Sequence, residues 1–400
     1  MTYIVIISTQ WGFLDGGVNC FNYDFSNALK ASLSNTRYRL ILISYENTLS
    51  TNGHRQFNES TITPIIVEES KALDQITSHL NNLIDVSSLL FVGHDIFTGP
   101  LANSLRIICK HPGKSVVFHH LDSSSYYPLK RPESIEENRR KTGVQYETLQ
   151  SADLVVSIGP KLFADAKNKI GQSVKMLIPG FHNIEVFDMN DKLAAITFGR
   201  YDIHTDNLKQ MRLAAIAFVS YVDKHRPDLP GDPTLSVIGV RDESEFSELN
   251  KTLNTLSAVN IELIKYINDR PVLFNKIARS SFCLMLSVHE GFGLAGYEAI
   301  AAGVPLILSK NSGLYIFLKR LCGERQLHAL GIYDIDITGY INGSINNTDL
   351  ISVQTAIHEV WNNLNYYKTG ILKLREFILT QNNWQQCSQS FIDMIEDIEV

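Results

Sequence analysis

The stretch that decides the fold reads SVHEGFGLAGYEAIAAGVPLILSKNSG, from Ser287 to Gly313. A buried strand is expected to end at Ser287, and the glycine loop Glu290–Gly293 follows it. A helix is predicted over Leu294–Ala302, because a glycine stops it and a proline two residues later blocks its continuation. The next strand covers Leu306–Ser309. This order of strand, glycine loop, helix and strand is typical of a Rossmann-like α/β domain.

The glycine loop carries the features of an anion site. Gly291 and Gly293 lack a Cβ atom, so the loop backbone can approach a ligand closely. The free N–H groups at the start of the following helix point into the same space, and they carry the positive end of the helix dipole. The stretch therefore predicts a site that holds a diphosphate without a metal ion.

Two carboxylates, Glu290 and Glu298, lie beside this predicted anion site. Such a placement is costly unless hydroxyl groups donate hydrogen bonds to the carboxylates. A sugar ring and a ribose supply hydroxyls of that kind. The spacing alone leaves a second interpretation open, in which the loop is purely structural and Glu290 is a solvated loop residue.

The rest of the 400-residue chain also alternates short apolar strands with amphipathic helices, and its length fits two α/β domains. Strands are predicted at Tyr3–Ser8, Leu40–Ser44, Pro64–Val67, Leu89–Val92, Ser115–Phe118, Leu154–Ser157, Lys175–Ile178, Ala194–Phe198, Leu235–Ile238, Ile261–Ile264 and Phe282–Ser287. Pro179-Gly180 and an irregular stretch after it interrupt the pattern and indicate a hinge. We therefore expect two Rossmann-like domains facing across a cleft, residues 1–182 and 183–375, with the ligand between the carboxyl ends of their sheets.

Composition excludes several classes of protein. The net charge of -6 gives no electrostatic footprint for nucleic acid, so no nucleic-acid partner is predicted. The five cysteines are scattered without a Cys-x-x-Cys pair, which argues against a zinc site or a disulfide framework and favours a reducing compartment. A membrane-spanning helix needs about 20 apolar residues in a row, and no such run occurs. We expect a cytoplasmic protein.

The segment Ser287–Gly313 resembles the glutamate–seven residues–glutamate motif of retaining GT-B glycosyltransferases, especially glycosyltransferase family 4. In that family the first glutamate contacts the donor sugar and the second binds the ribose hydroxyls. The resemblance assigns these two roles to Glu290 and Glu298. It also implies that the loop backbone binds the donor phosphates. The loop residues concerned are Gly291, Phe292, Gly293 and Leu294.

Other positions resemble the same family in chain order. Arg200, in Phe198-Gly199-Arg200, matches a Gly-Arg pair at the first strand end of the C-terminal domain, and Lys209 matches a lysine that follows it. Both cations would hold the diphosphate and stabilise the charge that develops on the leaving group. Near the N-terminus, Gly16 and Gly17 resemble a Gly-Gly loop that approaches the donor phosphate or sugar.

The strand end Phe118-His119-His120 resembles the place where family members often carry a histidine that faces the donor sugar. Two adjacent histidines make the assignment ambiguous, and we prefer His119 because it follows Phe118 directly. Together with Glu290, Arg200 and Lys209, His119 is predicted to act in catalysis. A purely structural histidine at a strand end stays the alternative.

The resemblance implies the GT-B fold, in which residues 376–400 form a C-terminal helix that packs back on the N-terminal domain. Residues 1–182 would bind the acceptor and residues 183–375 the nucleotide sugar. The implied reaction moves a sugar from a nucleotide-diphosphate donor to an acceptor hydroxyl with retention of anomeric configuration, without a cofactor or a metal. The acceptor follows no motif, so a saccharide, a lipid-linked group, a protein or a small molecule all stay open, as does peripheral membrane contact.

Two further sequence features lie towards the C-terminal end of the chain. Asp334-Ile335-Asp336 matches the metal-binding pattern of other glycosyltransferases, but it lies in a strand-like run, and we predict no metal there. Trp384 resembles a tryptophan that many family members carry near the C-terminus, and a core aromatic explains it equally well.

The alternatives to sugar transfer are a nucleotide-sugar-binding sensor or partner module without turnover, and a GT-B epimerase.

Overall fold

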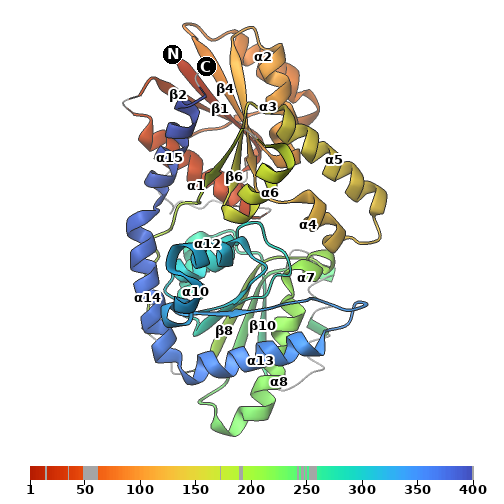
Figure 1. Cartoon of the computed structure of the whole chain (residues 1–400), viewed down its shortest axis with the longest axis vertical. Coiled ribbons are helices and arrows are strands. Elements are labelled where there is room, and N and C mark those ends of the chain that lie inside the picture. Colours follow the sequence, from red (N-terminus) through yellow and green to blue (C-terminus); the bar gives the residue numbers. More distant parts are fainter. Residues whose placement is uncertain are drawn as a thin grey trace. The chain divides into compact units, whose positions relative to one another are not determined.

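The chain forms two compact units, named unit 1 and unit 2 (Figure 1). The computed structural model describes residues 1–13, 16–34, 36–47, 62–171, 173–188, 192–240, 243–244, 247, 250–251 and 259–398. Unit 1 comprises Met1–Ser124, Ser134–Gly180 and Asn382–Val400, and unit 2 comprises Ser125–Glu133 and Phe181–Gln381. Each unit is built on its own parallel sheet with helices, which confirms the predicted α/β class.

The sheet of unit 1 has, within the described ranges, seven strands in the order β3-β2-β1-β4-β5-β6-β7, all paired in parallel. The strands are β1 (Thr2–Trp11), β2 (Tyr38–Asn47), β3 (Ile65–Ile66), β4 (Ser88–His94), β5 (Gly113–His119), β6 (Leu154–Ile158) and β7 (Val174–Leu177). The strand order reverses at β1, which has β2 on one side and β4 on the other. In open parallel sheets such a switch point is where ligands bind, at the carboxyl ends of the strands.

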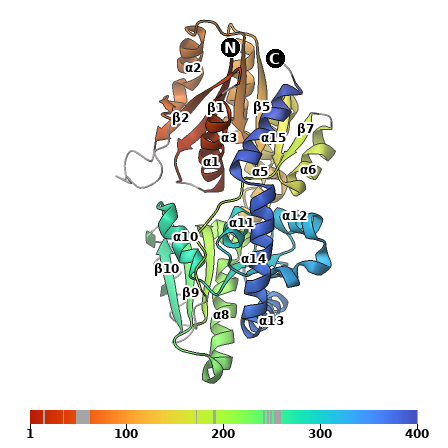
Figure 2. The same cartoon turned by 90° about the vertical axis from the view of Figure 1, so that its left-hand side faces the viewer.

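Helices cover both faces of this sheet. They are α1 (Gly17–Ser32), α2 (Ala72–Asn81), α3 (Asp95–Ile108), α5 (Ile135–Ser151), α6 (Pro160–Ile170) and α15 (Trp384–Glu396), with the short 3-10 turn η1 (Glu69–Lys71). On one face Phe25 of α1 lies 5.2 Å from Phe118 of β5 and 5.1 Å from Phe391 of α15, measured between ring centroids. The last helix therefore completes the core of unit 1, beside α1 (Figures 1 and 2), as the resemblance implied.

The sheet of unit 2 has, in the part of the chain that the structure describes, six parallel strands in the order β10-β9-β8-β11-β12-β13. The strands are β8 (Ala194–Tyr201), β9 (Thr234–Val240), β10 (Asn260–Lys265), β11 (Phe282–Met285), β12 (Leu306–Ser309) and β13 (Ile332–Ile335). Here the order reverses at β8, which lies between β9 and β11. The second switch point therefore lies between β8, which ends with Arg200 and Tyr201, and β11, which precedes the glycine loop.

The helices of unit 2 follow the same alternation with strands. They are α7 (Ile203–Lys209), α8 (Met211–His225), α10 (Arg270–Ala278), α11 (Leu294–Ala301), α12 (Gly313–Cys322), α13 (Asn347–Asn362) and α14 (Leu364–Gln381), with the 3-10 turns η2 (Arg226–Asp228), η3 (Glu324–Gln326) and η4 (His328–Leu330). The helix α4 (Ser123–Lys130) starts in unit 1 and continues into unit 2. Among the helices of the described residues, none is long and apolar enough to cross a membrane.

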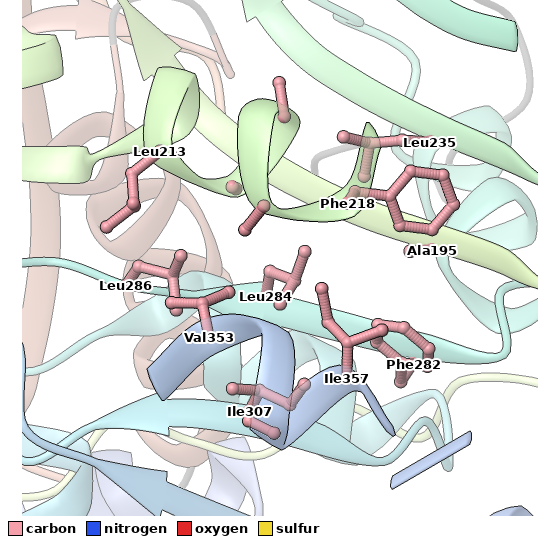
Figure 3. Packing of buried hydrophobic residues seen from close by; sticks show 14 of the residues in the cluster. Ala195, Leu213, Phe218, Leu235, Phe282, Leu284, Leu286, Ile307, Val353 and Ile357 are labelled. Carbon is pink, nitrogen blue, oxygen red and sulfur yellow. The ribbon is translucent and has the colours of Figure 1, made fainter. Parts of the chain in front are cut away.

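The core of unit 2 follows from the two-residue period of a strand. Phe282 and Leu284 of β11 share one cluster with Phe218 of α8 and Ile357 of α13 (Figure 3). The alternate residue of the strand, Cys283, is buried outside that cluster. The strands are therefore covered on both faces, which explains why they appear in the sequence as almost continuous apolar runs.

The units differ from the predicted domains in one segment and in the positions of the two other limits. We expected residues 1–182 to form one continuous domain, but Ser125–Glu133 groups with unit 2. The reason is visible in its contacts, because Lys130 Nζ lies 3.7 Å from a carboxylate oxygen of Asp202 in unit 2. The other limits of the units are Gly180/Phe181 and Gln381/Asn382.

The chain leaves unit 1 after Gly180 and returns to it at Asn382, and these two places are joined to each other. Asn382 Nδ2 donates a hydrogen bond of 2.6 Å to the carbonyl oxygen of Pro179. Gly180 lies directly against Trp384, and a Cβ atom at Gly180 would overlap the tryptophan ring. Trp384 also packs 5.8 Å from Phe21 of α1, so it is a packed aromatic that requires a glycine at position 180.

Candidate active site

The glycine loop is held against the start of α12. Gly313 N donates to the carbonyl oxygen of Glu290 over 3.2 Å, and a Cβ atom at Gly313 would overlap the carbonyl oxygen of Gly291. Gly293 has φ 113°, a left-handed conformation that disfavours side chains, and it is the N-cap residue of α11. Phe292 points inward and packs 5.2 Å from the ring of Tyr297. The loop is thus a rigid backbone turn ahead of a helix that begins at Leu294.

Lys209 and Glu290, predicted separately from the sequence, form an ion pair in the structure. Lys209 is the last residue of α7, and Glu290 belongs to the glycine loop that follows β11. Ser287 Oγ lies 3.4 Å from the same carboxylate oxygen of Glu290. The side chain of Lys209 is 25% exposed and that of Glu290 is 20% exposed, so each is accessible to a ligand.

Arg200 stands at the end of β8, where two glycines shape the backbone. Gly199 has φ 141°, and a Cβ atom at Gly239 would overlap the carbonyl oxygen of Gly199. The pairing of β8 with β9 shifts register between Phe198 and Tyr201, the stretch that contains Arg200. Its Nε lies 3.6 Å from Asp202 Oδ2, and the side chain is 37% exposed.

Asp202 organises the helix that carries Lys209. Its Oδ1 accepts hydrogen bonds from the backbone N–H groups of His204 (3.1 Å) and Thr205 (2.9 Å), which caps the N-terminus of α7. Burial raises the pKa of Asp202, but the N–H of Thr205 and the charges of Lys130 and Arg200 outweigh it, so the net shift is downward. Asp202 is therefore an ionised cap that also attracts the cations around it.

Glu298, the second predicted glutamate, pairs with a residue that the sequence did not suggest. One guanidinium nitrogen of Arg270 lies 2.9 Å from Glu298 Oε1 and 3.1 Å from His182 Nε2. Arg270 is the first residue of α10, its side chain is 5% exposed, and its guanidinium stacks 5.0 Å over the ring of Phe274. Arg270 and Glu298 lie on different helices, so their spacing in the sequence does not predict this pair.

His119, which we preferred from the sequence, and His120 differ in burial. His119 is completely buried, with Nδ1 3.0 Å from Asp95 Oδ1 and Nε2 3.9 Å from Asp165 Oδ2. Burial lowers the pKa of His119, but the carboxylates of Asp165 and Asp95 together raise it to about 9. His119 is therefore an enclosed, protonated imidazole between two carboxylates.

His120 is the partly exposed histidine of the pair. Its Nε2 lies 2.9 Å from Nδ1 of His94, and its backbone N–H donates to Asp95 Oδ2 over 2.8 Å. Burial, and then the charges of His94 and His119, lower the pKa of His120 well below its ordinary value, so the ring is neutral. Asp95, which has a φ of 41°, thus ties the buried His119 to the backbone of His120.

The predicted residues fall into two groups by unit. Gly17 starts α1, where Gly16 precedes it with φ 103°, and both belong to unit 1 together with His119. All the other predicted site residues belong to unit 2, where they follow the carboxyl ends of β8 and β11. The pair Asp334 and Asp336 lies elsewhere in unit 2 and flanks Lys310, at 3.5 Å and 3.0 Å from its Nζ.

Unit 2 also has an open cavity of about 640 Å³ that contains none of these residues. It lies at the amino ends of β8, β9 and β10, and its lining includes Ala194, Thr234, Glu262 and Arg279. The predicted donor residues follow the carboxyl ends of the strands. Because ligands of open parallel sheets bind at the carboxyl ends, we do not assign the donor to this cavity.

Comparison with known proteins gives a family. Residues 5–391 match the sequence model described as family 4 glycosyltransferase in conflict systems. Curated protein sequences gave no significant match.

Solved structures resemble the whole chain. Sucrose-phosphate synthase from Thermosynechococcus elongatus is 15% identical, covers 98% of both chains and has a TM-score of 0.67. HepE from Anabaena in complex with UDP-glucose is 13% identical, also covers 98% of both chains and has a TM-score of 0.70. WaaG, a glycosyltransferase involved in lipopolysaccharide biosynthesis, is 14% identical over 98% of this chain and 99% of that one, with a TM-score of 0.63. These likenesses support the fold.

Proposed function

This chain belongs to the family 4 glycosyltransferases in conflict systems, and from this membership we propose that it moves a sugar from a nucleotide-diphosphate donor to an acceptor hydroxyl with retention of anomeric configuration. The family makes the chain a glycosyltransferase with the GT-B fold. The donor, the stereochemistry and the roles of single residues are the parts that we propose.

One observation carries the proposal. Lys209 and Glu290 come from different elements, yet they pair beside the glycine loop, at the carboxyl ends of β8 and β11. In a nucleotide sugar, the sugar is bonded directly to the diphosphate. A lysine that binds the diphosphate and a carboxylate that binds the sugar hydroxyls must therefore lie close together. The ion pair meets this requirement, and it also keeps both charges compensated while no donor is bound.

The residues of unit 2 then take the following proposed roles. Arg200 and Lys209 bind the diphosphate, and the backbone N–H groups from Gly293 into α11 add hydrogen bonds and the positive end of the helix dipole. Glu290 accepts hydrogen bonds from the donor sugar, and Glu298, oriented by Arg270, accepts them from the ribose.

In unit 1 we propose roles for the glycine loop and the histidine pair. Gly17 would let the N-terminus of α1 approach the donor phosphate or sugar. His120 would present a neutral imidazole to the sugar, and His119 would act through Asp95 by fixing the strand end. His119 is then a positioning residue, not one that touches substrate.

The proposed chemistry uses the donor's own phosphate as the base. The bond between the anomeric carbon and the leaving phosphate oxygen breaks, and its electron pair goes to that oxygen. The acceptor oxygen forms a bond on the same face of the sugar, and its proton passes to the departing phosphate. Arg200 and Lys209 stabilise the charge that develops, so no cofactor and no metal ion are proposed.

The first test is a binding screen followed by a turnover assay. HepE was solved with UDP-glucose, so UDP and UDP-glucose enter the thermal-shift screen first, with GDP, ADP and their sugars beside them. We expect one diphosphate to raise the melting temperature in the presence of EDTA. If none of them does so, the donor site as proposed does not exist.

Turnover then separates the proposal from its alternatives. Glu290→Gln should keep nucleoside-diphosphate binding but lose most sugar transfer, because the amide cannot replace the carboxylate towards the sugar hydroxyls. Proton NMR of the product reports retention directly. Conversion of the nucleotide sugar without an acceptor would favour the epimerase, and binding without any product would favour the sensor.

A further inference from the structure

The segment Ser125–Glu133 belongs to unit 2, although the chain on both sides of it belongs to unit 1. It contains most of α4, whose last residue is Lys130. Its contact with Asp202 therefore lies within unit 2, which also contains Arg200.

Lys130 and Arg200 share one carboxylate oxygen. Lys130 Nζ lies 3.7 Å and Arg200 Nε lies 3.6 Å from Asp202 Oδ2. The side chain of Lys130 is 14% exposed and that of Asp202 is 16% exposed. Two cations are therefore held beside a single anion, at the strand end where the diphosphate is proposed to bind.

The charges around this point are not balanced. Lys130 and Arg200 bring two positive charges to Asp202, which brings one negative charge. Asp202 is already used as the cap of α7. Burial lowers the pKa of Lys130, with Arg200 and Arg131 adding to the effect, and only the charge of Asp202 opposes it. An additional anion at this place would therefore stabilise the positive charges of Lys130 and Arg200.

Tyr126 lies on α4 beside Lys130. It is partly buried, and Lys130 Nζ lies 6.0 Å from the centre of its ring. Burial raises the pKa of Tyr126, the charge of Glu290 raises it further, and Arg200 opposes the rise. The hydroxyl of Tyr126 therefore stays protonated.

We propose that Lys130 is a third cation of the donor site and binds the diphosphate together with Arg200 and Lys209. This inference rests on the proposed function, because it assumes that a nucleotide diphosphate binds at the end of β8. Asp202 holds Lys130 in place before the donor arrives. When the donor binds, the ammonium donates a charge-assisted hydrogen bond to a phosphate oxygen and shares the charge of the leaving group.

The experiment removes the charge while keeping the packing of the stem. Lys130→Met retains the apolar length of the side chain, and Lys130→Arg retains the charge. Calorimetric titration of the full chain uses whichever of UDP, GDP and ADP binds the wild type most tightly. We expect Lys130→Met to weaken this binding at least tenfold, and Lys130→Arg to recover most of the loss.

Two further variants make the result decisive. Arg131→Ala changes the next cation in the chain, an exposed residue, and should bind within about twofold of the wild type. Arg200→Ala should weaken binding if the proposed donor site is correct. If Arg200→Ala weakens binding while Lys130→Met binds as the wild type does, then Lys130 only pairs with Asp202 and the inference is wrong. If the wild type binds no diphosphate, the proposed function fails, and Lys130 loses its role with it.

Discussion

Arg270 holds Glu298 through a hydrogen bond of 2.9 Å from a guanidinium nitrogen to Oε1. The same nitrogen lies 3.1 Å from His182 Nε2, so the arginine joins α10, the α11 glutamate and the chain that follows Gly180. Because a carboxylate that binds ribose hydroxyls must be oriented, this contact gives Arg270 a place in the proposed donor site. The role can be tested without knowing the acceptor.

We expect Arg270→Ala to weaken nucleoside-diphosphate binding roughly tenfold or more, because it removes a charge-assisted hydrogen bond and leaves Glu298 without its cation. Arg270→Lys should recover only part of the loss, since one ammonium cannot reproduce the planar guanidinium. Titration calorimetry measures both. Lys276→Ala is the matched control, because Lys276 lies on the same helix and pairs with Glu262 instead. Equal affinities for the wild type and Arg270→Ala would remove Arg270 from the site.

The buried imidazolium of His119 predicts a stability that depends on pH. Its folded-state pKa is about 9, above the ordinary value of 6.5, so its contribution is fully present below about pH 6.5 and is lost as the pH rises through 9. The free energy of unfolding from urea titration should therefore fall between pH 6.5 and 9.5, by about 1–3 kcal/mol from this group. His119→Gln should show a flatter profile. Parallel profiles for the two proteins would contradict an ion pair at this site.

Gly293 is expected to tolerate no side chain. Gly293→Ala would place a Cβ atom at a φ of 113° and against the methyl group of Met285, so we expect a loss of about 1–3 kcal/mol in stability and weaker diphosphate binding. Gly143→Ala is the control, because a Cβ atom there meets open space on the helix α5. That control should be neutral or stabilising by up to about 1 kcal/mol. Thermal unfolding of both variants decides the matter, and a neutral Gly293→Ala would mean that the loop can rearrange.

Gly180 and Trp384 are expected to be coupled. Gly180→Ala forces a methyl group into the tryptophan ring and should cost about 1–3 kcal/mol. In a Trp384→Leu background the same change should cost clearly less, because the smaller side chain leaves room. A double-mutant cycle by urea unfolding measures the difference. Strict additivity would show that the two residues do not press on each other.

The sequence supplied most of the fold because the two sheets are parallel. Buried parallel strands read as short apolar runs, and the strand predicted over Leu306–Ser309 has those limits in the structure. The helix predicted over Leu294–Ala302 is observed at Leu294–Ala301, since glycines mark both of its ends. Local rules determine these features, so local sequence was sufficient to predict them.

The parts of the site that sequence could not supply depend on contacts between distant elements. Which of His119 and His120 is buried depends on the elements that cover the end of the strand. The carboxylates beside His119 come from such elements, Asp95 from α3 and Asp165 from α6. Arg270 and Lys130 look like ordinary cations near helix ends. The residues next to them in the sequence do not indicate that Arg270 contacts Glu298 or that Lys130 lies near Asp202.

The grouping of Ser125–Glu133 with unit 2 has a practical meaning for protein engineering. A chimera that takes only Phe181–Gln381 from a relative would keep the host's α4 and so mix residues from two parents at the end of β8. Exchanging donor specificity between relatives would therefore require transplanting two pieces of sequence at once, the long one and the nine-residue segment that contains Lys130.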